Sequence, residues 1–259
     1  MKPWVGLHTI MRITILGSGT GEPSLTRGSP GILLRVRRRL ILIDSGSGTL
    51  RALLHEGVTY RDIDGIYYTH LHCDHVSELA PILFAMKNMS APREKALYLV
   101  GPAGFKKYYH GLLRLNASTL NPIDYNLFIE EMWESVLERH GIVIRSNPVN
   151  HTPTSVAYRF ESGGKSIVFS GDTGYCASIV GLARNADLLV LECSFPDEFG
   201  VEGHLTPSLA GRIAAEAGAK KLLLTHLYPA CESFDIATQC KKVFSGEIVI
   251  ACDGLKVKT

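Results

Sequence analysis

The chain has 259 residues, of which 46% are apolar and 20% are charged. This composition excludes a disordered or coiled-coil chain, and the length is ample for a packed core. The 27 basic and 25 acidic side chains leave a net charge of +2, so any contact with RNA must come from a local patch.

The sequence pattern predicts neither a membrane-spanning segment nor an export signal. No run of about 18 uncharged apolar residues predicts a transmembrane helix. Residues 1–10 lack the apolar stretch of a signal peptide. None of the six cysteines has Cys-x-x-Cys spacing, which argues against a zinc knuckle. We therefore expect reduced thiols, a cytoplasmic location and no membrane partner.

Apolar runs separated by glycine, proline and polar residues predict alternating elements along the chain. Strands are predicted at residues 12–16, 32–36, 40–43, 65–69, 97–100, 142–149, 155–161, 165–170, 188–191, 221–224 and 248–250. One helix is predicted to follow the 44–48 turn and to end at residue 55. Further helices are predicted at 76–89, 103–115, 207–217 and 236–244. Strands covered by helices in each half predict an α/β sandwich of two facing sheets.

The domain limits follow from the same pattern. Residues 1–11 are expected to be an N-terminal extension, and 12–259 a single domain. Residues 116–140 are the least periodic and carry five acidic side chains against Arg139 alone. We predict a partly helical insertion there, serving as a lid or rim over a site or as a dimer contact.

Glycines and arginines mark the main turns. Residues 17–21 contain three glycines but lead to Pro23 rather than to a helix, which favours a tight turn over a phosphate-binding loop. Residues 37–39 are three arginines at the tip of a predicted hairpin, and Gly163 with Gly164 predicts another hairpin turn. Pro207 after Thr206 predicts a helix start.

The strongest chemical signal directly follows the 65–69 strand. His70, His72, Asp74 and His75 place four potential ligands within six residues. Imidazole and carboxylate together suit zinc, iron or manganese. A strand end can aim His70 and His72 at one ion, while Asp74 and His75 can aim at a second. Four ligands are too many for one zinc ion that keeps an open coordination position, so the pattern predicts two ions.

Three further candidates also follow predicted strands. They are His151, Asp172 and His226. Ligands at the carboxyl ends of successive strands converge on one edge of the sheets. We therefore expect all seven side chains to form one metal centre. Asp44 and Asp253 are candidates to orient ligand imidazoles, or else plain residues at strand ends.

The segment Thr69–His75 matches the His-x-His-x-Asp-His signature of the metallo-β-lactamase superfamily, and the downstream motifs around His151, Asp172 and His226 follow in order. The chain most resembles ribonuclease Z and its relatives, through residues 16–24, 192–195 and 203–206. The resemblance implies a four-layer αββα sandwich, the metallo-β-lactamase fold. It covers nearly all of residues 12–258.

The resemblance also implies roles for these residues. His70, His72 and His151 would hold one metal and Asp74, His75 and His226 the other, with Asp172 bridging both. Asp74 would also orient or deprotonate the attacking hydroxide. His204 would contact the scissile phosphate or protonate the leaving oxygen, and Glu192 would orient His204.

These roles predict a dinuclear metallo-hydrolase, with zinc preferred and manganese or iron fitting the same ligands. We expect a phosphodiesterase acting on a small diester or an RNA 3′ end. The alternatives are a hydrolase of lactones, thioesters or aryl sulfates, or a non-catalytic metal-binding protein. Cys73 is expected to be a small filler that points away from the ligands.

One departure from ribonuclease Z bears on the substrate. That group grips tRNA with a flexible basic arm, whereas we assign the acidic residues 116–140 to the corresponding region. An acidic arm would weaken contacts to phosphate, so tRNA is a doubtful substrate. The resemblance also implies a homodimer.

Overall fold

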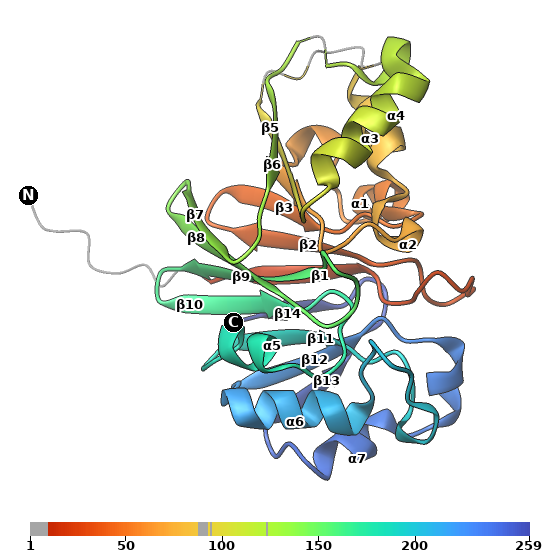
Figure 1. Ribbon diagram of the computed structural model, residues 1–259, viewed down its shortest axis with the longest axis vertical. Helices are drawn as coiled ribbons and strands as arrows, with labels where there is room; N and C mark the ends of the chain where they lie inside the picture. Colours follow the sequence, from red (N-terminus) through yellow and green to blue (C-terminus); the bar gives the residue numbers. More distant parts are fainter. Residues whose placement is uncertain (1–9, 88–92, 94, 123) are drawn as a thin grey trace, which may run out of the picture.

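The computed structural model describes residues 10–87, 93, 95–122 and 124–259, and it has two facing seven-stranded sheets with helices on both outer faces (Figure 1). The four-layer sandwich predicted from the sequence is therefore confirmed. In the described part of the chain, no helix has the length and hydrophobicity needed to cross a lipid bilayer.

Each sheet takes its strands from one half of the chain, apart from the C-terminal strand. In spatial order the first sheet contains β14 (Lys256–Lys258), β1 (Arg12–Gly17), β2 (Gly31–Val36), β3 (Arg39–Ile43), β4 (Gly65–Tyr67), β5 (Leu97–Gly101) and β6 (Leu127–Glu131). The second contains β13 (Glu247–Ile250), β12 (Lys221–Thr225), β11 (Leu188–Glu192), β10 (Lys165–Phe169), β9 (Val156–Ser162), β8 (Ile142–Pro148) and β7 (Ser135–Arg139).

The helices divide between the two outer layers. Those of the first half are α1 (Thr49–His55), α2 (Cys73–Val76), α3 (Leu79–Lys87) and α4 (Phe105–Leu120), with the 3₁₀ turn η1 (Tyr60–Asp62). Those of the second half are α5 (Ala177–Leu182), α6 (Pro207–Ala217) and α7 (Ile236–Lys241), with η2 (Asp197–Phe199) and η3 (Pro229–Ser233).

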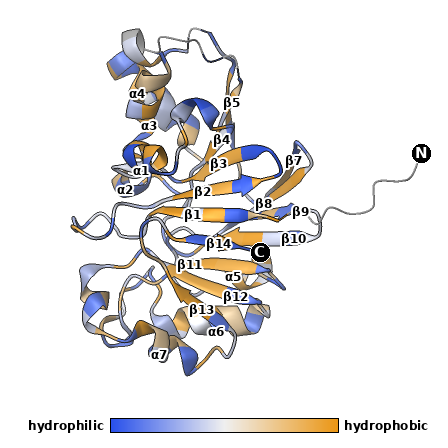
Figure 2. Cartoon of the chain, turned by 180° about the vertical axis from the view of Figure 1, so that it is seen from behind, coloured by the Kyte–Doolittle hydropathy of each residue, from blue (hydrophilic) through white to orange (hydrophobic). Residues whose placement is uncertain are grey.

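The alternation of side chains along each strand builds the layers. In β2, Ile32 and Leu34 enter the core between the sheets, whereas Leu33 packs under the helices of the first half. Both faces of such a strand are buried, so its residues form a nearly continuous apolar run. Figure 2 shows this hydrophobic colouring along the strands of both sheets. A third cluster fills the space between the second sheet and α5–α7.

Parallel pairing brings the strand ends together. In the first sheet β3, β4, β5 and β6 run parallel, and in the second sheet β10, β11, β12 and β13 do. The loops that follow β3, β4, β10 and β12 therefore leave the sandwich at the carboxyl ends of their strands, where α/β sites are usually found.

Residues 116–140 include the end of α4, which extends to Leu120, and two strands that were not predicted. After α4 they form β6 and β7, the edge strands of the two sheets. Their acidic residues have structural partners: Glu130 pairs with Arg139 at 2.6 Å, and Glu131 accepts the backbone N–H of Lys106 at 2.8 Å. In both strands exposed residues lie among partly buried ones, so their sequence lacks the apolar run of the central strands. The role of this segment as a lid or dimer contact stays a prediction.

Other boundaries differ by smaller amounts. The predicted 76–89 helix is divided between α2 and α3, and its last two residues lie outside the described part of the chain. Most of the predicted N-terminal extension also lies outside it, but Met11 is fully buried in the core between the sheets. The strand β14 and the helix α5 were not predicted. The Gly163–Gly164 turn is confirmed, with φ of 58° and 75°.

Asp187 provides a test of the second sheet. Its carboxylate accepts from Lys165 Nζ at 3.1 Å, Lys220 Nζ at 2.9 Å and the backbone N–H of Ser166 at 2.9 Å. Burial alone would raise the pKa of Asp187, but these donors lower it below its ordinary 3.8. We expect Asp187→Asn to reduce the free energy of unfolding by about 1 kcal/mol at pH 7, because both lysines are partly exposed.

This contribution depends on the carboxylate being ionised. It should be fully present above about pH 4 and disappear as the pH falls through the lowered pKa of Asp187. Urea denaturation at several pH values measures it, with Asp124→Asn at an exposed position as the control. An Asp187→Asn deficit that grew on acidification would contradict the assignment.

Candidate metal centre

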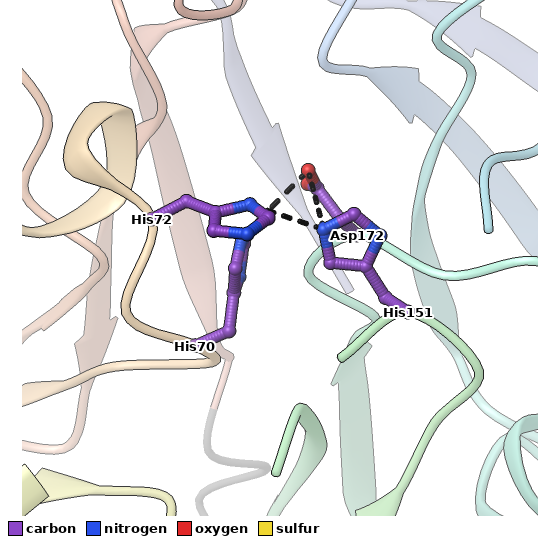
Figure 3. Close-up of side chains that lie close together, drawn as sticks. All are labelled: His70, His72, His151 and Asp172. Atoms are coloured by element: carbon purple, nitrogen blue, oxygen red, sulfur yellow. Dashed lines mark hydrogen bonds and ion pairs between the residues drawn. The ribbon is translucent and has the colours of Figure 1, made fainter. Parts of the chain in front are cut away.

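The seven predicted ligands come from both sheets and meet at one edge of the sandwich. His70, His72, Asp74 and His75 lie on the loop and short helix that follow β4. The remaining three, His151, Asp172 and His226, follow β8, β10 and β12 in the second sheet. Figure 3 shows three of the histidines and Asp172 pointing toward one another across the gap between the sheets.

The first group of candidate ligands contains His70, His72, His151 and Asp172. Asp172 Oδ2 lies 3.8 Å from Nε2 of both His70 and His151, and His151 Nε2 lies 3.2 Å from His72 Nδ1. A tetrahedral ion with ligands at 2.0–2.1 Å separates those ligands by about 3.3 Å. The group therefore has the size of a metal site.

The second group contains Asp74, His75 and His226. Nε2 of His75 and His226 lie 3.4 Å apart, and 3.7 and 3.5 Å from Asp74 Oδ2. The other oxygen of Asp172, Oδ1, lies 3.3 Å from His75 and 3.4 Å from His226. The two oxygens of one carboxylate thus face different sets of histidines.

The donors fit a divalent cation. His70 Nε2 and Asp172 Oδ1 are buried polar atoms without a hydrogen-bond partner in the described part of the chain. Such atoms are rare unless water or an ion satisfies them. Imidazole nitrogen and carboxylate oxygen are donors that zinc, iron and manganese accept. Cys73 is exposed and belongs to none of the candidate ligand groups.

The far nitrogen of several imidazoles is held by a hydrogen bond. His75 Nδ1 donates to Asp44 Oδ2 at 2.9 Å, and His151 Nδ1 donates to the carbonyl oxygen of Gly203 at 3.0 Å. Thr69 Oγ1 donates to Asp44 at 2.9 Å and accepts from His70 Nδ1 at 3.0 Å. These bonds fix the tautomer that leaves Nε2 facing the cluster.

The backbone is strained where it turns these side chains inward. Asp44 and His226 both have φ of 56°, in the left-handed region that β-strand residues avoid. Gly171, just before Asp172, has φ of 59°, and a Cβ there would lie 2.5 Å from Thr69. Strain of this kind persists only where the surrounding structure enforces it, and it concentrates at functional sites.

Burial and neighbouring charges shift the pKa values within the cluster. Burial, and then the neighbouring His75, lower the pKa of His70 to about 2, so its imidazole is neutral, as metal binding requires. Burial would raise the pKa of Asp74, but His226 and His75 hold it at about 2. Burial would lower the pKa of His75, but Asp172 and Asp44 raise it well above its ordinary value.

A histidine–glutamate pair lies beside the cluster. His204 Nδ1 donates to Glu192 Oε1 at 2.8 Å, and the His204 ring lies 4.8 Å from that of His151. Glu192 is held in turn by the Thr173 N–H at 2.9 Å and the Ser194 hydroxyl at 2.6 Å. Burial would lower the pKa of His204, but Glu192 outweighs burial and raises it.

The two expected orienting aspartates behave differently. Asp44 contacts a ligand imidazole, whereas Asp253 does not. Asp253 accepts instead from the backbone N–H groups of Ser18 at 2.8 Å and Gly28 at 2.7 Å, and so fixes the loop after β1.

Two hydroxyls were not predicted as part of the site, those of Thr69 and Ser194. Ser194 Oγ accepts from His226 Nδ1 at 3.0 Å. In the sequence, Thr69 directly precedes His70, and Ser194 lies two residues after Glu192. Only the fold brings Ser194 close to His226.

Comparison with known proteins shows the family to which the chain belongs. Residues 39–227 match the family model of the β-lactamase superfamily domain. Ribonuclease Z of Myxococcus xanthus is 28% identical, over 96% of this chain and 98% of its own. The probable metallo-hydrolase YhfI of Bacillus subtilis is 30% identical, over 94% of this chain and 98% of its own.

Solved structures give the same result for the fold. The crystal structure of the metallo-β-lactamase fold protein YhfI from Bacillus subtilis has a TM-score of 0.84 and 29% identity, covering 96% of this chain and all of that one. Human tRNase Z, short form, has a TM-score of 0.79 and 24% identity, covering 95% and 98% of the two chains.

The fold and the histidine–aspartate cluster define a metallo-hydrolase class. The chain belongs to the β-lactamase superfamily, and its relatives include proteins named ribonuclease Z.

The Asp44–His75 bond gives a test of the site. We expect Asp44→Ala to weaken metal binding at the Asp74–His75–His226 group by about 10–100-fold, because His75 loses the partner that orients it. Metal content after equilibration with graded chelator measures this loss. Asp253→Asn is the control, because Asp253 contacts no ligand imidazole. Equal losses in the two variants would show that Asp44 acts only through general stability.

Proposed function

We propose that this protein is a dinuclear metal-dependent phosphodiesterase, with zinc as the preferred ion. The carrying observation is the position of Asp172. Its Oδ2 lies 3.8 Å from His70 and His151, and its Oδ1 lies 3.3–3.4 Å from His75 and His226. One buried carboxylate between two sets of imidazoles is the arrangement expected of a ligand shared by two ions.

The chain's own groups supply the ligands. His70, His72 and His151 would hold one ion, and Asp74, His75 and His226 the other. When bound, two such ions would supply a water of lowered pKa as nucleophile and would neutralise charge on the phosphoryl oxygens.

Asp74 is placed to accept the proton of the attacking water. Its side chain is 18% exposed, more than the 4% of Asp172 and His226, so it lies on the open side of the group. A pKa of about 2 keeps it ionised at neutral pH. It can therefore accept a hydrogen bond from the nucleophile and orient it toward the phosphorus.

His204 is placed to protonate the leaving oxygen. The bond from Nδ1 to Glu192 leaves Nε2 for the substrate. Glu192 raises the pKa of His204, so a larger fraction of the imidazole is protonated at neutral pH than for a free histidine. A general acid of this kind favours phosphodiesters with an alkoxide leaving group over thioesters and aryl sulfates, whose thiolate and phenolate leaving groups are weaker bases.

Turnover should require both groups of ligands. We expect bis(p-nitrophenyl) phosphate hydrolysis to rise with bound metal and to saturate at two ions per chain. In Asp74→Ala it should fall by at least about 100-fold, because an ion ligand and the proton acceptor are lost together. Absorbance of p-nitrophenolate measures the rate, and Asp124→Asn is the control. A wild-type protein with two bound ions and no turnover would move the assignment to lactones, thioesters or aryl sulfates.

The role of His204 should depend on the leaving group. We expect His204→Ala to reduce kcat about 10²–10⁴-fold for a diester with an alkoxide leaving group. The loss should be much smaller for bis(p-nitrophenyl) phosphate, because p-nitrophenolate leaves without protonation. Steady-state kinetics on both substrates, with His55→Ala as an exposed control, measure the difference. Equal losses on the two substrates would contradict the general-acid role.

A further inference from the structure

Two large aromatic side chains, Phe195 and Tyr228, lie next to the candidate metal centre. Their rings stack on each other, with centroids 4.7 Å apart and planes at 17°. Both side chains are half-buried, and neither belongs to the three hydrophobic clusters formed by the described residues. Aromatic rings outside the core, beside a few well-placed polar groups, are typical of sites for small molecules.

The register of the second sheet brings the two rings together. β11 and β12 are parallel neighbours in which Glu192 pairs with Thr225. Phe195 and Tyr228 each lie three residues beyond that pair, so they leave adjacent strands at the same level. The two loops also have a bond of their own, from the Tyr228 N–H to the carbonyl oxygen of Ser194 at 3.4 Å. The stacked rings are therefore not the only connection between the loops.

The aromatic pair borders the groups that would act on the leaving oxygen. The centroid of the Phe195 ring lies 6.0 Å from that of His204, and the centroid of the Tyr228 ring lies 5.9 Å from that of His226. Both contacts are nearly perpendicular, at 77° and 73°. His204 is the group placed to protonate the leaving oxygen. A substituent carried by that oxygen would therefore lie along the Phe195–Tyr228 pair.

Two exposed carboxylates also border the centre. Glu22 follows Gly21, where a Cβ would lie 3.5 Å from Asp74. Glu202 precedes Gly203, whose carbonyl oxygen accepts a hydrogen bond from a candidate ligand imidazole. Neither glutamate has an ion-pair partner among the residues that the structure describes. Like charges repel, so these side chains disfavour further phosphates and favour a substrate with a single phosphodiester.

We propose that Phe195 and Tyr228 form a subsite for an aromatic ring on the leaving alcohol. The preferred substrate is then a small phosphodiester with an arylalkyl group on its leaving oxygen. The proposal rests on the proposed function and narrows its substrate class. A third ring gains offset or edge-to-face contacts at centroid distances of about 4.5–7 Å, which a saturated group of the same size does not.

The reaction defines which product carries the ring. Water attacks phosphorus and gives a proton to Asp74, while the bond from phosphorus to the leaving oxygen breaks. His204 gives its proton to that oxygen. Benzyl methyl phosphate therefore yields benzyl alcohol and methyl phosphate. Methanol and benzyl phosphate would instead place the ring on the part of the substrate that stays on phosphorus.

The first test compares three diesters that share a methyl group: benzyl methyl, cyclohexylmethyl methyl and dimethyl phosphate. The metal-loaded full chain is used, and chromatography quantifies the alcohols and monoesters. We expect kcat/KM for the benzyl ester to exceed that for dimethyl phosphate at least about 10-fold, because apolar surface is buried. It should exceed that for the cyclohexylmethyl ester at least about 2-fold, through stacking. Equal values for these two esters, or methanol as the main alcohol from benzyl methyl phosphate, would overturn the proposal.

Variants of the pair locate the preference. Phe195→Leu and Tyr228→Leu should each reduce the benzyl-to-cyclohexylmethyl ratio of kcat/KM to about 1 and raise KM for the benzyl ester at least about 3-fold. The ratio is taken within one variant, so a general loss of activity cancels. Tyr228→Phe keeps the ring and should keep the ratio. If Tyr228→Phe lost the ratio as Tyr228→Leu does, the hydroxyl rather than the ring would be responsible, and the proposal would be wrong.

A second stacked pair provides the matched control. Phe128 stacks on Tyr98 with centroids 5.0 Å apart and planes at 15°. Tyr98 pairs with Gly65 at the start of β4, whereas the candidate ligands follow the carboxyl end of that strand. Phe128→Leu should therefore leave the ratio and KM unchanged. An equal loss of the ratio in Phe128→Leu would contradict the assignment of the subsite.

Binding without turnover separates this proposal from the proposed function. Ethyl(2-phenylethyl)phosphinate has the charge and ring of the benzyl ester but no ester bond to hydrolyse. Calorimetry on the metal-loaded chain should give a Kd at least about 2-fold lower than for ethyl(2-cyclohexylethyl)phosphinate, and Phe195→Leu should remove the difference. If this holds but no diester is cleaved, the proposed function fails and the subsite remains. If diesters are cleaved without preference for the ring, the proposed function remains and the subsite is wrong.

Discussion

The carboxylate of Asp172 is the interaction on which the site depends. It is buried among four imidazoles, and each of its two oxygens faces one histidine that follows a strand of the first sheet and one that follows a strand of the second. A buried charge in such a position is costly unless opposite charge compensates it. The two sheets must therefore be placed accurately relative to each other, which is what the continuous core between them achieves.

The strained backbone has a related cause. Parallel strands deliver residues to one edge of each sheet, but a side chain at a strand end continues along the strand unless the backbone turns. The left-handed conformations turn Asp44 toward Thr69 and His75, and His226 toward His75 and Asp74 of the other sheet. The bonds that His75 donates to Asp44 and His226 donates to Ser194 then hold the imidazoles in place. Strain is offset by hydrogen bonds made at the same residues.

In the proposed function, the candidate metal centre and the groups around it contribute differently. The centre would supply chemistry that suits many esters, so it would select substrates weakly. Selection would come from the His204–Glu192 pair beside it, which suits a basic leaving oxygen. The pair and the ligands are separate side chains, so one can vary while the others stay fixed.

The sequence by itself predicted the candidate ligands and the four-layer fold, because histidines and aspartates packed closely in the chain and strands buried on both faces leave local patterns. It also indicated the His204–Glu192 pair through the family resemblance. Tertiary structure alone decided that Asp44 orients an imidazole while Asp253 fixes the β1 loop, since both residues simply follow strands. It decided too that residues 127–139 are edge strands, where exposed residues among partly buried ones weaken the apolar pattern.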